Sequence, residues 1–153
     1  MDKENHTFSY PTGVKSFVFQ FSSKALQWLC GTTTDDNGWK TNNITLFDDL
    51  LSRMALTDGT STGFHRPLCL SAGQAQYSEE QLSKQWKMGR KRIRRLLDEL
   101  TRLGLIETHR SRVASMMTFP CLLGWETEDN GSIAAPFSLK QRESQRMQQS
   151  GDK

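Results

Sequence analysis

The clearest pattern in this chain is an apolar stripe with helical spacing, which occurs twice. In residues 44–56 the stripe consists of Phe47, Leu50, Leu51 and Met54. In residues 90–104 it consists of Ile93, Leu96, Leu97, Leu100 and Leu103. Steps of three and four residues are typical of amphipathic helices. The sequence therefore predicts one helix that begins after a capping Asn42 or Asn43, and a second helix that ends at Gly104.

A shorter helix is predicted just before the second of these. Ser78 and Gln81 have the spacing of a capping box, in which each side chain bonds the other residue's backbone amide. Leu82 and Trp86 lie one turn apart and supply a buried face. Gly89 then permits a sharp reversal of the chain. The pattern predicts a helix, a tight turn and a longer helix in succession.

A hairpin is predicted after Gly104, where the run LIETHRSRVASMMTF reads as two short strands. Its tip falls at residues 110–112 and carries two arginines, and Pro120 ends the second strand. The apolar residues that follow are expected to return to the core: Leu122, Leu123 and Trp125.

The first part of the chain has weaker patterns. The aromatic run at residues 16–21 is compatible with a short strand, and Ser22 or Ser23 can equally cap a helix over residues 24–30. Residues 31–43 and 57–66 read as loops from their Gly, Thr, Asp and Asn content. Residues 67–77 are compatible with a short strand or an extended approach to the next helix.

The chain of 153 residues is long enough for one domain with a core and short for two. We expect a flexible arm over residues 1–15, one domain over residues 16–125 and a polar, disordered tail over residues 126–153. No run approaches the roughly 20 apolar residues of a membrane span, and no signal peptide is evident. These features predict a cytoplasmic protein without membrane contact.

Cysteine and histidine give no metal signature. The three cysteines Cys30, Cys69 and Cys121 are far apart and form no CxxC pair, so we expect reduced, mostly buried thiols. The histidines are scattered, and no metal or other cofactor is predicted. Asp48 and Asp49 are adjacent, but neighbouring helix residues point about 100° apart. A solvated helix face is therefore expected for this pair, rather than a shared metal or acid–base site.

Positive charge is concentrated in one stretch of the chain. Residues 84–112 hold ten basic and three acidic residues, a net charge of +7, whereas the whole chain has a net charge of only +3. Several cations at the start of a helix oppose its dipole and repel one another. Such a concentrated patch favours a polyanionic partner.

This order of short helix, turn, basic helix and hairpin resembles the winged helix-turn-helix family of DNA-binding domains. The matching segments are SEEQLSKQW, KMG, RKRIRRLLDELTRLGLI and ETHRSRVASMMTF. More loosely, GWKTNN, LLSRMA and AGQAQYSEEQL resemble the N-terminal domains of phage and plasmid replication-organiser proteins. The resemblance implies an α+β fold with a three-helix core, a β-hairpin wing and an N-terminal extension. One departure is Gly89, where family members often carry a Ser or Thr cap.

The resemblance also implies sequence-specific binding of double-stranded DNA. It assigns Arg90, Lys91, Arg94 and Arg95 to the major groove, Lys84 and Lys87 to phosphates, and Arg110 and Arg112 of the wing to the neighbouring backbone or minor groove. From the residues themselves, Arg can bond guanine O6 and N7 bidentately, whereas Lys on phosphate positions the protein without reading sequence. His109 is a further candidate for a phosphate contact from the wing.

The role implied is transcriptional regulation or the control of replication and mobile elements. The alternative is a winged helix that binds a protein partner or RNA. No phosphate-binding Gly loop, GxSxG or HExxH motif is present, so no catalytic residue is nominated and no enzyme is expected. The Phe-rich N-terminal segment is a candidate surface for a homodimer, and the N-terminal extension or the tail for a protein partner. The tryptophans are expected in the core or a lid: Trp28, Trp39, Trp86 and Trp125.

Overall fold

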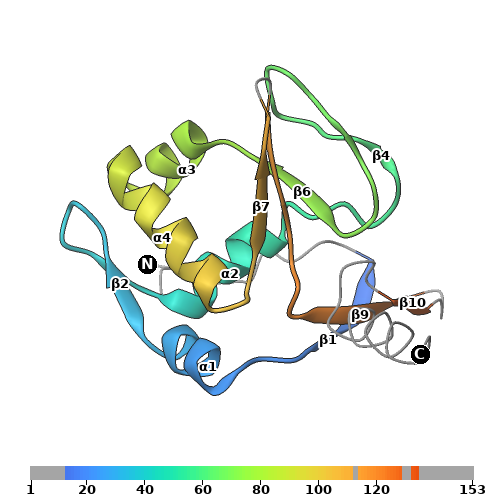
Figure 1. Ribbon diagram of the computed structural model, residues 1–153, viewed down its shortest axis with the longest axis horizontal. Helices are drawn as coiled ribbons and strands as arrows, with labels where there is room; N and C mark the ends of the chain where they lie inside the picture. Colours follow the sequence, from blue (N-terminus) through green and yellow to red (C-terminus); the bar gives the residue numbers. More distant parts are fainter. Residues whose placement is uncertain (1–12, 112–113, 129–131, 135–153) are drawn as a thin grey trace, which may run out of the picture.

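The computed structural model describes residues 13–111, 114–128 and 132–134, which form a mixed α+β fold with small antiparallel sheets (Figure 1). The helices of this part of the chain are α1 (Ser23–Leu29), α2 (Asn43–Leu51), α3 (Glu79–Trp86) and α4 (Arg90–Arg102). The strands are β1 (Val14–Phe19), β2 (Thr32–Thr34), β3 (Lys40–Asn42), β4 (Gly59–Thr60), β5 (Cys69–Leu70), β6 (Gln74–Tyr77), β7 (Glu107–Arg110), β8 (Ser115–Thr118), β9 (Leu122–Thr127) and β10 (Ser132–Ala134).

The centre of the fold is the sheet β6-β8-β7 with α2, α3 and α4 beside it. In Figure 1, β7 runs up the middle, with α3 and α4 on one side and β6 and β4 on the other. The predicted stripe of α4 is confirmed, since Ile93, Leu97 and Leu100 are fully buried. They join one core with residues of α2 and the sheet, including Leu50 and Met117. Burial of these side chains holds α4 against the sheet.

A second sheet, of order β1-β9-β10, joins segments from both sides of the centre. β1 begins at Val14, within the predicted arm, and β9 and β10 run into the predicted tail. Trp125 and Leu122 of β9 are buried as predicted. Strand residues thus lie on both sides of the predicted range 16–125. Residues 1–12 and 135–153 lie outside the described part.

The segment around Ser22 contains both predicted elements, a strand followed by a capped helix. β1 is the predicted strand, and Ser22 then caps α1 by accepting a bond from the Ala25 amide at 3.1 Å. The aromatic residues of β1 lie against the core: the Phe19 and Phe47 ring centroids are 5.9 Å apart in an edge-on arrangement. Phe47 in turn contacts Phe119 at 6.1 Å.

The predicted loop over residues 31–43 is wrong, because it contains the hairpin β2–β3. Its turn is organised by Asp35, whose Oδ1 accepts from the amides of Asn37 at 2.8 Å and Trp39 at 3.0 Å. Gly38 adopts φ +87° in this turn. The strands carry polar and Thr residues with no buried alternation, so the pattern did not indicate them. The second predicted loop, residues 57–66, likewise contains β4. Residues 67–77, compatible in sequence with a short strand or an extended approach to the next helix, contain two short strands, β5 and β6.

Predicted caps of α2 are also wrong. Asn42 occupies the N-cap position without a side-chain bond to the helix. Asn43 is buried instead, and its amide donates to the Trp28 carbonyl at 2.6 Å. Asn43 therefore ties α2 to the end of α1 rather than capping its own helix.

Four predicted exposures differ from the structure. Asp48 is buried, beside a hollow that residues of the β2–β3 hairpin and the end of α3 also line. Cys30 and Cys69 are exposed, at a helix end and on a two-residue strand, and of the three thiols Cys121 is the buried one. Trp39 is 68% exposed because it follows the turn of the hairpin.

Candidate nucleic-acid interface

The corner between α3 and α4 is built from local contacts that the sequence only partly predicts. Ser78 caps α3 as predicted, since its Oγ accepts from the Gln81 amide at 3.2 Å. The reciprocal half of the capping box is wrong, because Gln81 Nε2 donates to the Gly63 carbonyl at 3.0 Å. Gln81 thus ties the start of α3 to the loop after β4.

The chain reverses at Lys87 and not at Gly89. Lys87 has φ 57° and is the one residue other than glycine with a positive φ in the described ranges. Gly89 has an extended conformation as the N-cap of α4, with φ −64° and ψ 157°. The buried Met88 lies between them and closes the corner, its amide donating to the Ser83 carbonyl at 3.2 Å.

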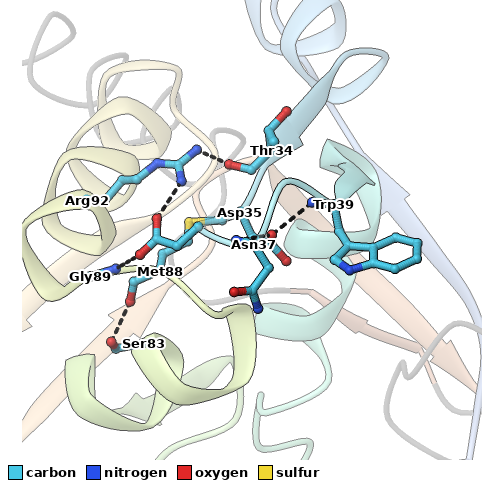
Figure 2. A network of polar contacts seen from close by, with 9 residues as sticks. Thr34, Asp35, Asn37, Trp39, Ser83, Met88, Gly89 and Arg92 are labelled. Carbon is cyan, nitrogen blue, oxygen red and sulfur yellow. Dashed lines mark hydrogen bonds and ion pairs between the residues drawn. The ribbon is translucent and has the colours of Figure 1, made fainter.

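Asp36, at the turn of the β2–β3 hairpin, supplies the cap that Gly89 cannot. Figure 2 shows Asp35 and Asn37 of this turn beside Gly89 and Arg92. Its Oδ2 accepts from the Gly89 amide at 2.9 Å, and its Oδ1 pairs with Arg92 Nη1 at 3.0 Å. The Asp36 amide also donates to the Lys87 carbonyl at 3.0 Å. A carboxylate at a helix N-terminus satisfies a free amide and favours the helix dipole. The negative charge of Asp36 also offsets the repulsion among the cations in the first turn of α4.

Arg92 therefore belongs to the hairpin contact and not to the exposed face of α4. Its guanidinium also donates to the Thr34 carbonyl in β2. Lys91, Arg94 and Arg95 lie on the exposed side of the helix, opposite the buried stripe. Within the described residues, Lys91 and Arg95 have no ion-pair partner. These two side chains are available to an external anion.

Glu79, the first residue of α3, gathers three arginines from two elements. Its Oε1 lies 2.9 Å from Arg94 Nε and 3.7 Å from Arg90 Nη2, and its Oε2 lies 3.5 Å from Arg110 Nη2. The Glu79 side chain is only 9% exposed, while the three arginine side chains are 50–59% exposed. The start of α4 and strand β7 therefore present their guanidinium groups side by side, over one shared carboxylate.

The β7–β8 hairpin forms the other wall of this cluster. Arg110 of β7 pairs with Ser115 of β8, and Ser115 pairs with Tyr77 of β6, so one row of the sheet leads from Arg110 to Tyr77. Burial raises the pKa of the Tyr77 hydroxyl above its ordinary value, against an opposing effect of the Arg110 charge. His109 is exposed on β7, and Arg112 lies outside the described residues.

The two predicted phosphate-binding lysines lie on different sides of α3. Lys84 is 76% exposed and pairs with Glu80 at 3.6 Å, and it lines one hollow together with Arg90 and Arg110. Lys87 lines a separate hollow with Trp39 and Lys40 of the β2–β3 hairpin. The structure thus brings Lys84 together with the arginine cluster, and places Lys87 beside the hairpin.

No pattern in the sequence indicates the two carboxylates that organise this surface. Asp36 lies within the predicted loop over residues 31–43, and the predicted capping box involves only Ser78 and Gln81, which flank Glu79 in the chain. A possible signal was Gly89, because a helix start with several cations and no capping side chain needs an acceptor from elsewhere. Nothing local pointed to Glu79, since its arginine partners lie 11, 15 and 31 residues further along the chain.

In the part of the chain that the structure describes, no group of three or more His, Cys, Asp or Glu side chains is arranged to hold a metal ion. None of the helices within the described ranges is long and apolar enough to cross a membrane. Comparison with protein-family models, with characterised proteins and with solved structures finds no match for this chain.

Proposed function

We propose that this chain is a winged helix-turn-helix domain that binds double-stranded DNA. The order α2, β6, α3, α4, β7, β8 and the sheet order β6-β8-β7 agree with a three-helix core and a β-hairpin wing. In this proposal α4 is the recognition helix and the β7–β8 hairpin is the wing. The segment before α2, with the hairpin β2–β3, is the N-terminal extension.

One observation carries the proposal: cationic side chains of α4 and β7 converge on one face. Arg90, Arg94 and Arg110 are half-exposed around Glu79, and Lys91 and Arg95 are exposed beside them. A helix of 13 residues fits the major groove of B-form DNA, where Arg reads guanine bidentately. A wing beside the helix lies over the adjacent backbone. Regulation of transcription and control of replication or mobile elements both use such a domain.

The test is fluorescence anisotropy with a labelled random-sequence duplex over a series of salt concentrations. Counterion release predicts a log–log slope of about −0.9 per phosphate contacted. The variant Lys91→Ala/Arg95→Ala should weaken binding and flatten the slope, by up to about 1.8 if both side chains contact phosphate. These two residues are chosen because neither supports a buried carboxylate.

The matched control is Lys15→Ala/Lys24→Ala, which removes the same charge from exposed positions on β1 and α1. Equal effects of the two double variants would mean that only net charge matters, and would overturn the proposed interface. A-form RNA has a deep, narrow major groove that side chains cannot read. Binding of double-stranded RNA as tight as that of DNA, or no binding of either at low salt, would favour an RNA or protein partner instead.

A further inference from the structure

Glu79 puts a negative charge in the middle of a surface that, in the proposed function, meets a polyanion. The Glu79 side chain is only 9% exposed, and three arginines lie around its carboxylate. Glu80, its neighbour, is 66% exposed and pairs only with Lys84 among the described residues. The two acids thus have different surroundings although they are adjacent on the same helix turn.

The contacts of Glu79 show how its negative charge can stabilise a cluster of arginines. Three guanidinium groups within reach of one point repel one another, and a carboxylate among them offsets that repulsion. Arg94 donates a hydrogen bond to Glu79 from Nε at 2.9 Å, whereas Arg90 and Arg110 form ion pairs with it at 3.7 Å and 3.5 Å. Because a guanidinium has five donors, most of them remain available to an outside acceptor. The half-exposure of Arg90, Arg94 and Arg110 agrees with this division of donors.

The geometry also links the start of α4 to the far end of β7, the element that follows α4 in the chain. Arg90 and Arg94 belong to α4, whereas Arg110 belongs to β7. Tyr77 lies in one row of the sheet with Ser115 and Arg110, and Glu79 follows Tyr77 by two residues. The sheet register and the start of α3 together fix where the carboxylate stands relative to Arg110.

We propose that Glu79 is a positioning residue that determines specificity: it holds the guanidinium groups of α4 and the wing in one arrangement. The inference rests on the proposed binding of DNA. With the arginines held, a duplex that matches their arrangement bonds all of them at little cost in side-chain entropy. Without the carboxylate, the arginines spread over many rotamers and bind any phosphate backbone. Glu79 thus lowers sequence-independent affinity and raises discrimination.

The experiment compares Glu79→Gln with Glu80→Gln. Each substitution removes one negative charge, at adjacent positions of α3, so both variants should bind a random duplex more tightly, by up to about fivefold. A preferred duplex is first selected from a randomised pool with the wild-type protein. The measured quantity is the ratio of affinities for the selected and the random duplex.

Glu80→Gln should keep this ratio, and Glu79→Gln should lower it about tenfold, the size of one lost bidentate base contact. A second variant, Glu79→Asp, keeps the charge and a good helix start but draws the carboxylate back by one carbon. It should bind the random duplex like the wild type and still lose discrimination. This variant keeps the inference testable if Glu79→Gln does not fold, and a purely structural role would not separate the two affinities.

Equal ratios for the wild type, Glu79→Gln and Glu79→Asp would overturn the inference while leaving DNA binding intact. The same would follow if Glu80→Gln lost as much discrimination as Glu79→Gln. A wild-type protein that binds no duplex at low salt would overturn the proposed function itself, and the role of Glu79 with it. The two failures are therefore distinguishable in one set of measurements.

Discussion

Replacing Asp36 by Ala should destabilise the fold although Asp36 lies on an exposed turn 53 residues from its partner Gly89. The substitution removes the acceptor of the Gly89 amide, and loss of such a cap costs about 0.5–2 kcal/mol. It also removes the ion pair with Arg92, whose side chain is 38% exposed, as against 54% for Asp36. A partly exposed pair adds about 0–1 kcal/mol. We expect a total loss of about 1–2 kcal/mol.

The assay is urea unfolding followed by circular dichroism, with thermal unfolding in parallel. A loss of this size corresponds to a midpoint temperature lower by about 2–8 °C for a chain of this length. Asp36→Asn retains an acceptor for the Gly89 amide but not the charge, so it should lose about half as much. A double-mutant cycle with Arg92→Ala isolates the ion pair, and the remainder measures the cap.

Asn37→Ala is the matched control, because Asn37 is exposed on the same turn and should change stability by less than about 0.5 kcal/mol. The reasoning would be refuted if Asp36→Ala unfolded at the same urea concentration as Asn37→Ala. That result would mean that the hairpin does not hold the start of α4.

Two further predictions concern buried groups. Burial raises the pKa of Cys121 from 9.0 to about 12, so at pH 8 a thiol reagent should modify Cys30 and Cys69 rapidly and Cys121 only on unfolding. Because the folded state favours the neutral thiol, burial of Cys121 contributes to stability below pH 9.0, and this contribution is lost as the pH rises to about 12. The free energy of unfolding in urea should therefore fall over that pH range. Trp86→Phe removes the bond from the indole Nε1 to Asp49 Oδ2, 2.8 Å long, and should cost about 1–2 kcal/mol in urea unfolding.

The Cys121 and Trp86 predictions each have a control variant within the chain. Cys30→Ala should leave the alkaline slope of stability unchanged while Cys121→Ala reduces it; rapid modification of all three thiols in the folded protein would contradict the first prediction. Trp39→Phe makes the same substitution at a side chain that is 68% exposed, and should leave the urea midpoint unchanged. Equal losses at Trp39 and Trp86 would contradict the second.

The parts of the fold that could be predicted are those that local physics specifies. The apolar stripe of α4 and the Ser78 cap of α3 are each encoded within a few residues, so their helices are read directly from the sequence. The hairpin after Gly104 follows from its turn and alternation. Each of these features involves residues that are neighbours in the chain.

The parts that could not be predicted depend on residues that meet only in the folded state. The hairpin β2–β3 has no apolar face to mark it, and it is held by a turn around Asp35 and by Asp36 against α4. The bond of Gln81 to the Gly63 carbonyl displaced the expected capping box. At the candidate site, the cations were visible in the composition, but the carboxylate of Glu79 that gathers them was not.

The pairing of β1 with β9 sets an order on how the molecule folds. Val14 lies opposite Thr127, so this pairing closes a loop that contains nearly all of the other described elements. Closing so long a loop costs chain entropy before any contact is gained. The helical corner of α3 and α4 needs only local closure and can form first. During synthesis, β1 therefore cannot pair until β9, the last long strand of the described chain, has been made, although Phe19 of β1 can meet Phe47 of α2 earlier.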